Sequence, residues 1–154
     1  PRIIAVIGAD TKKVKWAMCC KWKGQHAARF TPDGKIMLLD NYGVKKDDLR
    51  QSRVLEISTS SGNVTVRYAG TKENPFRTHT MGRVQLLPNG NVIAVESNRG
   101  RIFEFNDKGD IVWQYKLIES NRYGVGEVPH ATRYSYEYFT FMNAEKAEAG
   151  SAEN

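Results

Sequence analysis

The sequence predicts an all-β protein: a partial β-propeller of four-stranded antiparallel blades, with about three blades in an incomplete ring. Three observations carry this prediction. Two segments repeat the same order of features at a period of about 50 residues, turn dipeptides separate their apolar runs, and apolar and polar residues alternate within those runs. Because propellers close with about four to eight blades, this number would leave the ring open.

The two complete repeats lie at residues 25–68 and 81–115. The first contains HAARFTPDGKIMLLDN, SRVLEI and SGNVTVRY, and the second contains GRVQLLPNGNVIAVES, GRIFEF and KGDIVWQY. In both, an Asp-Gly or Asn-Gly pair separates the first two strands, and we expect a two-residue turn there because these residues tolerate positive φ angles. Each repeat therefore predicts four strands.

The two ends of the chain continue the pattern. Residues 2–18 resemble the last two strands of a blade, with Trp16 at the place of Trp113, and PHATRY at 129–134 echoes HAARF at the start of the first repeat. The resulting division is the end of a blade at 1–24, blades at 25–80 and 81–128, the start of a further blade or a closing strand at 129–143, and a tail at 144–154 that we expect to be disordered because it has little to bury.

Composition and charge indicate a globular chain. Hydrophobic residues make up 40% and charged residues 26% of its 154 residues, and no apolar run approaches the roughly 18 residues of a membrane helix. The net charge is +6, and five lysines in residues 12–23 alternate with apolar residues as on the outward face of a strand. A polyanion-binding patch with steep salt dependence is the alternative. We expect neither a nucleic-acid nor a membrane partner.

Cysteine and histidine spacing gives no sign of a metal site. Cys19 and Cys20 are adjacent, and neighbouring cysteines rarely bridge each other because the small ring strains the peptide between them. They form no CxxC motif, and His26, His79 and His130 lack the close spacing of metal ligands. Serine-nucleophile and phosphate-loop motifs are also lacking, so catalysis would depend on histidine.

The stretch GQHAARFTPDGKIMLLDNYG, followed by QSRVLEI, resembles the C-terminal blades of the aryl sulfotransferase (arylsulfate sulfotransferase-like) family of β-propeller enzymes. The family pattern combines a Gln-His pair, an apolar strand, a DG or NG turn, an Asp-Asn-Gly-like loop and a Ser-Arg start to the next strand. The matching residues are Gln25, His26, Asp33, Gly34, Asp40, Asn41, Gly43, Ser52 and Arg53. The second repeat and residues 131–138 are also similar to this family, so the resemblance covers most of residues 3–141.

This resemblance implies that a sulfuryl group passes from a phenolic sulfate ester to a phenol through a sulfohistidine, without a nucleotide cofactor. His26 matches the histidine that takes the sulfuryl group in the family. The family also uses further histidines and an arginine from earlier blades, so we expect this chain to act as part of a larger chain or assembly and to be inactive in isolation.

Several other residues have two readings. Gln25, Asp40 and Asn41 are candidates for supporting His26, whereas Asp40 and Asn41 can also form a simple turn. Arg53 and Arg101 recur at equivalent strand starts, which favours a repeated structural contact over a unique anion ligand. For the remaining histidines, at positions 79 and 130, a structural or rim role is the simpler interpretation.

The competing function is a non-catalytic propeller that binds a ligand or protein through its rim, because fold and function are separable. In either case, open blade faces favour a homo-oligomer or pairing with missing blades of a parent chain. The family resemblance implies a periplasmic or extracellular protein, although residues 3–8 lack the length of a secretory signal.

Overall fold

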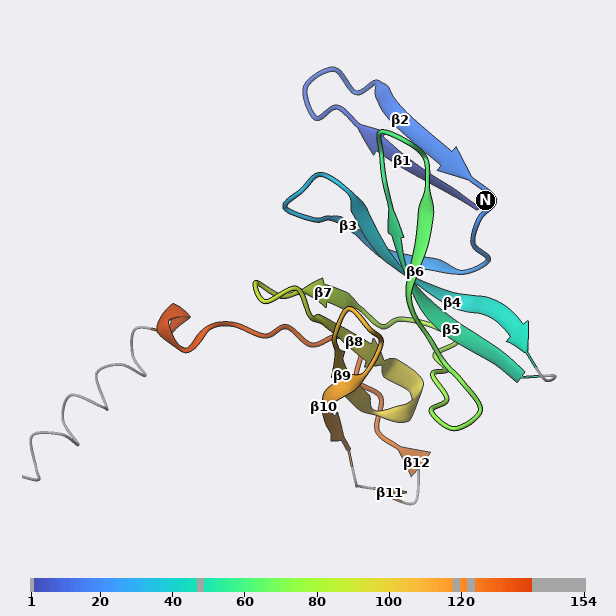
Figure 1. Ribbon diagram of the computed structural model, residues 1–154, viewed down its shortest axis with the longest axis vertical. Coiled ribbons are helices and arrows are strands. Elements are labelled where there is room, and N and C mark those ends of the chain that lie inside the picture. The colour runs from blue at the N-terminus through green and yellow to red at the C-terminus, as the bar shows by residue number, and fades with distance from the viewer. Residues whose placement is uncertain (1, 47–48, 118–119, 122–123, 140–154) are drawn as a thin grey trace, which may run out of the picture.

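A computed structural model describes residues 2–46, 49–117, 120–121 and 124–139. These residues form antiparallel sheets that follow one another along the chain (Figure 1). The first is a hairpin of β1 (Ile3–Ile7) and β2 (Val14–Cys19). Two four-stranded sheets follow, and the all-β, partial-propeller prediction is confirmed.

The first blade contains β3 to β6 in the order of the sequence. Its strands are β3 (Gln25–Phe30), β4 (Ile36–Lys46), β5 (Leu49–Ile57) and β6 (Val64–Ala69).

The second blade has the same order from β7 to β10. Its strands are β7 (Val84–Leu86), β8 (Val92–Glu96), β9 (Arg101–Phe105) and β10 (Ile111–Lys116), with a 3-10 turn, η1 (Ser97–Arg99), between β8 and β9. The two-residue strands β11 (Ser120–Asn121) and β12 (Gly124–Val125) pair with each other, and η2 (Tyr136–Tyr138) follows them.

The turns between the first two strands of each blade are one residue longer than expected. In the first blade the Thr31 amide donates to the Lys35 carbonyl at 2.9 Å, so residues 32–34 form a three-residue loop. In the second blade the Leu87 amide donates to the Asn91 carbonyl at 2.8 Å in the same way. Gly34 has a φ of 78°, and a Cβ there would meet nothing within 4 Å. Glycine is therefore favoured here by backbone conformation alone, as in hairpin loops that end on a left-handed residue.

Two apolar clusters lie between successive sheets. Strand β4 supplies both of them because its side chains alternate between its two faces. Ile36 and Leu38 contribute to the cluster shared with the hairpin, whereas Met37 and Leu39 contribute to the cluster shared with the second blade. All four side chains are buried, so the first blade is packed on both faces.

The outer face of the hairpin is apolar and exposed. Ile3, Ile7 and Val14 are 54%, 59% and 61% exposed. Self-association, or pairing with missing blades of a parent chain, stays a prediction. This exposed apolar face is the surface that such a contact would cover.

Residues 128–133 lie against the second blade. The Val128 amide donates to the Ser97 carbonyl at 3.2 Å, and the Gly82 amide donates to the Pro129 carbonyl at 3.2 Å. The Gln85 side chain donates to the Arg133 carbonyl and accepts from the Arg133 amide, at 2.9 and 2.8 Å. These contacts place the predicted start of a further blade beside β7, but residues 129–134 form no strand there.

A further blade after residue 129 stays a prediction, as do the segment limits drawn from the sequence. The tail at 144–154 lies outside the described residues. Within the part of the chain that the structure describes, no helix is long and apolar enough to cross a membrane.

Candidate functional site

His26 lies at the start of β3, the innermost strand of the first blade, and its side chain is exposed. In the β3–β4 ladder it pairs with Leu39. Cross-strand partners share one face of a sheet, and Leu39 packs in the cluster between the two blades. The His26 side chain is therefore on the face of the first blade that is turned toward the second blade.

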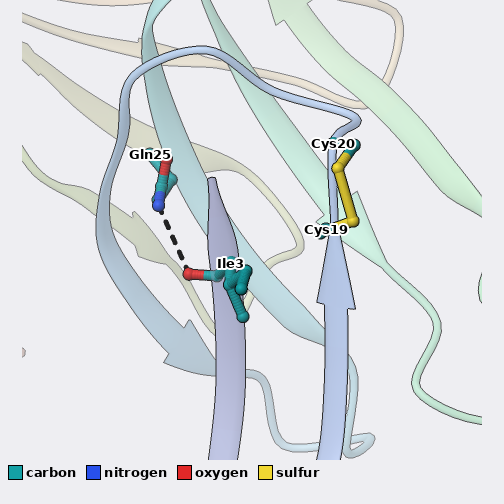
Figure 2. Close-up of a disulfide and its surroundings, with 4 residues drawn as sticks. All are labelled: Ile3, Cys19, Cys20 and Gln25. Carbon is teal, nitrogen blue, oxygen red and sulfur yellow. Dashed lines mark hydrogen bonds between the residues drawn. A yellow bond between two sulfur atoms is a disulfide. The ribbon is translucent and has the colours of Figure 1, made fainter. Parts of the chain in front are cut away.

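Gln25 is on the opposite face. It pairs with Asp40 in the ladder, and its side-chain Nε2 donates to the carbonyl of Ile3 in the hairpin at 3.3 Å (Figure 2). The two residues therefore face different sheets. Gln25 links the start of β3 to the hairpin, whereas His26 faces the second blade.

A β-bulge follows His26 directly. The ladder resumes with Arg29 opposite Met37, so Ala27 and Ala28 together face a single residue of β4. Ala27 has a φ of 51°, in the left-handed region. Without a bulge, residues three apart in a strand point to opposite faces. Here the extra residue brings Arg29 to the same face as His26.

Arg29 is a neighbour of His26 on this face that the sequence reasoning missed. A spacing of three in a strand separates two side chains, and nothing in HAAR marks the bulge. The non-glycine residue at positive φ is visible only in the folded chain.

Asp40 holds the loop that leads into β3. Its carboxylate is fully buried and accepts from the backbone amides of Lys23 and Gly24, at 3.0 and 2.8 Å. Arg53 Nε donates to its other oxygen at 2.9 Å, and Arg53 Nη2 donates to the Lys21 carbonyl at 2.7 Å. None of these bonds reaches His26, so Asp40 can affect that residue only by fixing the loop before it.

The second blade repeats this arrangement with Glu96. Glu96 Oε1 accepts from the Arg77 amide at 2.6 Å, and Arg101 Nε lies 2.8 Å from Oε2. Arg101 Nη2 donates to the Pro75 carbonyl at 2.9 Å. We call each carboxylate with its arginine, Asp40–Arg53 and Glu96–Arg101, a clamp. The interpretation of the two arginines as a repeated structural contact is confirmed.

Asn41 links the beginnings of the two innermost strands. Its amide donates to the Gly24 carbonyl at 2.8 Å, and its Nδ2 donates to the Met81 carbonyl at 3.2 Å. Its Oδ1 is buried without a hydrogen-bond partner. The alternative reading of Asp40 and Asn41 as a simple turn is wrong, because both residues lie within β4, where the register with β5 is irregular between Asp40 and Val44.

In the sequence alignment of the two repeats, Gly82 is the residue that corresponds to His26. It has a φ of 83°, and a Cβ there would lie 2.6 Å from Leu39 Cδ2 and 2.7 Å from the Val95 carbonyl oxygen. Both values are too short for a real contact, so position 82 has no room for a histidine side chain.

The other two histidines are exposed. The His79 ring lies 6.5 Å from the Tyr42 ring, between centroids, and its amide donates to Asn98 Oδ1 at 2.8 Å. His130 follows Pro129 in the segment that lies beside the second blade. No cluster of three potential metal-binding side chains occurs among the described residues.

Cys19 and Cys20 form a disulfide at the end of β2, so the expectation that these neighbours would not bridge is wrong. Figure 2 shows this bond near Ile3, which pairs with Cys19 and accepts the hydrogen bond from Gln25. Cys20 has a φ of 76°. This backbone conformation, which the sequence does not reveal, occurs where the strand has ended and the chain turns toward β3.

Comparison with known proteins agrees with this fold. Residues 2–118, well over half of the chain, match the family described as arylsulfotransferase (ASST). A search of curated proteins finds no match. The matched range contains the hairpin and both blades, with His26, both clamps and the bulge. The chain therefore belongs to the arylsulfotransferase family and is a sulfotransferase-like propeller.

Proposed function

We propose that His26 is the nucleophile of a sulfuryl transfer from a phenolic sulfate ester to a phenol. The observation that carries the proposal is an exposed histidine at the start of an innermost strand, directly before a bulge. Bulges are over-represented beside active sites, where they redirect side chains. Family membership supports the general substrate class, phenolic sulfates and phenols.

The reaction takes two displacements at sulfur. A ring nitrogen of neutral His26 attacks the sulfur, the sulfur–oxygen bond to the aryl group breaks, and the phenolate leaves with the bonding electron pair. The oxygen of a second phenol then attacks the same sulfur, and the nitrogen–sulfur bond breaks to regenerate imidazole while the phenolic proton is lost to a base or to water. No nucleotide takes part in either step.

The polar residues around His26 would act by holding its backbone in place. The clamp of Asp40 and Arg53 fixes residues 21–24, and Asn41 ties Gly24 to Met81. Gln25 adds the bond to Ile3. A nucleophile whose neighbouring backbone is held on three sides loses little orientational freedom on reaction, which lowers the barrier.

We also propose an oxidising compartment, periplasmic or extracellular. The disulfide between Cys19 and Cys20 supports it, since disulfides persist chiefly in such compartments.

Turnover of 4-nitrophenyl sulfate by the full-length protein, with phenol as acceptor, tests the proposal. His26→Ala should lower kcat by roughly 10³-fold or more, as expected for loss of a nucleophile. His79→Ala and His130→Ala are the matched controls and should keep the activity. Unchanged turnover in His26→Ala would reject the nucleophile assignment and favour a propeller that binds partners through its rim.

A further inference from the structure

A sulfate ester is an anion, and most arginines near the first blade are already paired. Arg53 is bound to Asp40, Arg67 to Glu56, and Arg101 to Glu96. Arg29 differs from them. It is exposed, and its side chain forms no hydrogen bond or ion pair with other described residues. Its guanidinium is therefore free to bind an anionic ligand through paired N–H donors.

The bulge places this free guanidinium beside His26. Their ladder partners, Met37 and Leu39, are two residues apart on β4 and both pack in the cluster between the blades. Two residues of strand span about 6.6 Å. An arginine side chain can cover that distance, so its donors can reach the oxygens of a sulfuryl group whose sulfur is in contact with the His26 ring.

A cavity of about 250 Å³ lies between β3 and β7, and Arg29 is one of its lining residues. Its lining includes the apolar residues Met37, Val84 and Leu86, together with the polar residues Thr31 and Gln85. An apolar cavity of about 150 Å³ can hold benzene, so this space is large enough for one aromatic ring. Arg29 is the charged residue at its edge, and that arrangement suits a ligand with one ring and one anionic group.

We propose that Arg29 binds the sulfate group of the donor and that the cavity between β3 and β7 accepts its single aromatic ring. This inference rests on the proposed function, because it gives a donor site to the reaction assigned to His26. To the phenolic sulfates of the proposed function it adds a limit of one aromatic ring and a binding residue that the sequence pattern does not contain.

Binding to a full-length protein that cannot turn over separates the two proposals. In the His26→Ala background, calorimetry would measure the Kd of 4-nitrophenyl sulfate and of 4-nitroanisole, a neutral molecule with the same ring. Adding Arg29→Met should weaken the sulfate ester by about 10-fold to 100-fold, the usual range for charged hydrogen bonds. It should leave 4-nitroanisole unchanged, and Arg29→Lys should restore part of the affinity.

Leu86→Trp tests the cavity, since a larger side chain in its wall should weaken both ligands. Equal affinity of the sulfate ester with and without Arg29→Met would overturn the inference, and so would a lack of binding to the His26→Ala protein. Thermal unfolding of each variant shows whether its fold is kept. Because no turnover is measured, the inference can fail while His26 remains the nucleophile, or survive if another residue takes that role.

Discussion

The first and second blades have the same architecture but differ at the beginning of the innermost strand. Both pair their strands in sequence order, and both use a buried carboxylate and an arginine to hold the loop before that strand. At the beginning of β3 stands an exposed histidine followed by a bulge. The residue aligned with His26 in the second repeat is Gly82, where an added Cβ would meet Leu39 and the Val95 carbonyl.

This difference separates scaffold from site. The clamp recurs because each blade must fix its connecting loop. Its presence therefore does not indicate a catalytic site. The histidine and the bulge in the innermost strand occur in the first blade and, among the described residues, not in the second, as expected for a function added at one position of a repeated fold. The following predictions test the shared features first and the unshared ones afterwards.

Breaking either clamp should have the largest effect on stability. Asp40→Ala leaves Arg53 and two backbone amides without their acceptor, and Glu96→Ala does the same to Arg101 and the Arg77 amide. Removing one partner of a buried ion pair costs about 3–5 kcal/mol. Urea unfolding should show losses of this size for both variants. A loss below about 1 kcal/mol in either would mean that the two blades are not held in the same way.

A side chain added at Gly82 should have the next largest effect on stability. Gly82→Ala combines a left-handed backbone with overpacking against Leu39, for an expected loss of about 2–4 kcal/mol in unfolding free energy. Gly34→Ala is the matched control, since its φ is similar but its surroundings are empty. It should lose only the backbone part, about 1–2 kcal/mol. Equal losses would show that packing does not exclude a side chain from position 82.

The turn of the first blade should add a pH dependence that the second blade lacks. Thr31 and Lys35, which bind its carboxylate, lower the pKa of Asp33 to about 2 from its ordinary 3.8. A lowered pKa stabilises the fold above the unfolded value, so this contribution is present above about pH 4. It disappears as the pH falls through 2.

Asp33→Asn gives the first turn the amide that Asn89 provides in the second. The difference in Tm between this variant and the native protein should therefore shrink between pH 4 and pH 2. If the difference in Tm stays constant between pH 4 and pH 2, the Asp33 carboxylate does not stabilise the fold in this way.

Reduction of the disulfide should have the smallest effect. The bond joins adjacent residues at the end of β2, so it removes little chain entropy from the unfolded state. We expect a change in unfolding free energy of less than about 1 kcal/mol. Denatured protein should resist alkylation of Cys19 and Cys20 until a reductant is added. Immediate alkylation without reductant would show that the bond is not formed.

The sequence predicts the repeated part of this molecule well. Period, alternation and turn residues identify both blades and the hairpin, because these features follow from local backbone preferences and burial. It does not predict the parts that depend on irregular backbone. The positive φ at Ala27 and Cys20, which accompany the bulge and the disulfide, belongs to residue types that seldom adopt it.

Strand register explains the other residues that the sequence places wrongly. Asp40 and Asn41 look like a turn in the sequence, yet they continue β4 because Asp40 finds its partners in the preceding loop and in Arg53. Arg29 looks unrelated to His26 until the bulge shifts the ladder by one residue. Both depend on contacts between segments that local sequence patterns do not encode.

The central claim is that His26, at the beginning of the innermost strand of the first blade, carries the sulfuryl group. It is tested most directly by incubating the full-length protein with 4-nitrophenyl sulfate without acceptor, quenching in base and mapping peptides by mass spectrometry. The account predicts one added SO₃ group on the peptide that contains His26. This group should be lost in acid, on addition of phenol, and in the His26→Ala variant. An adduct on another residue, or turnover with no adduct on His26, would contradict the claim.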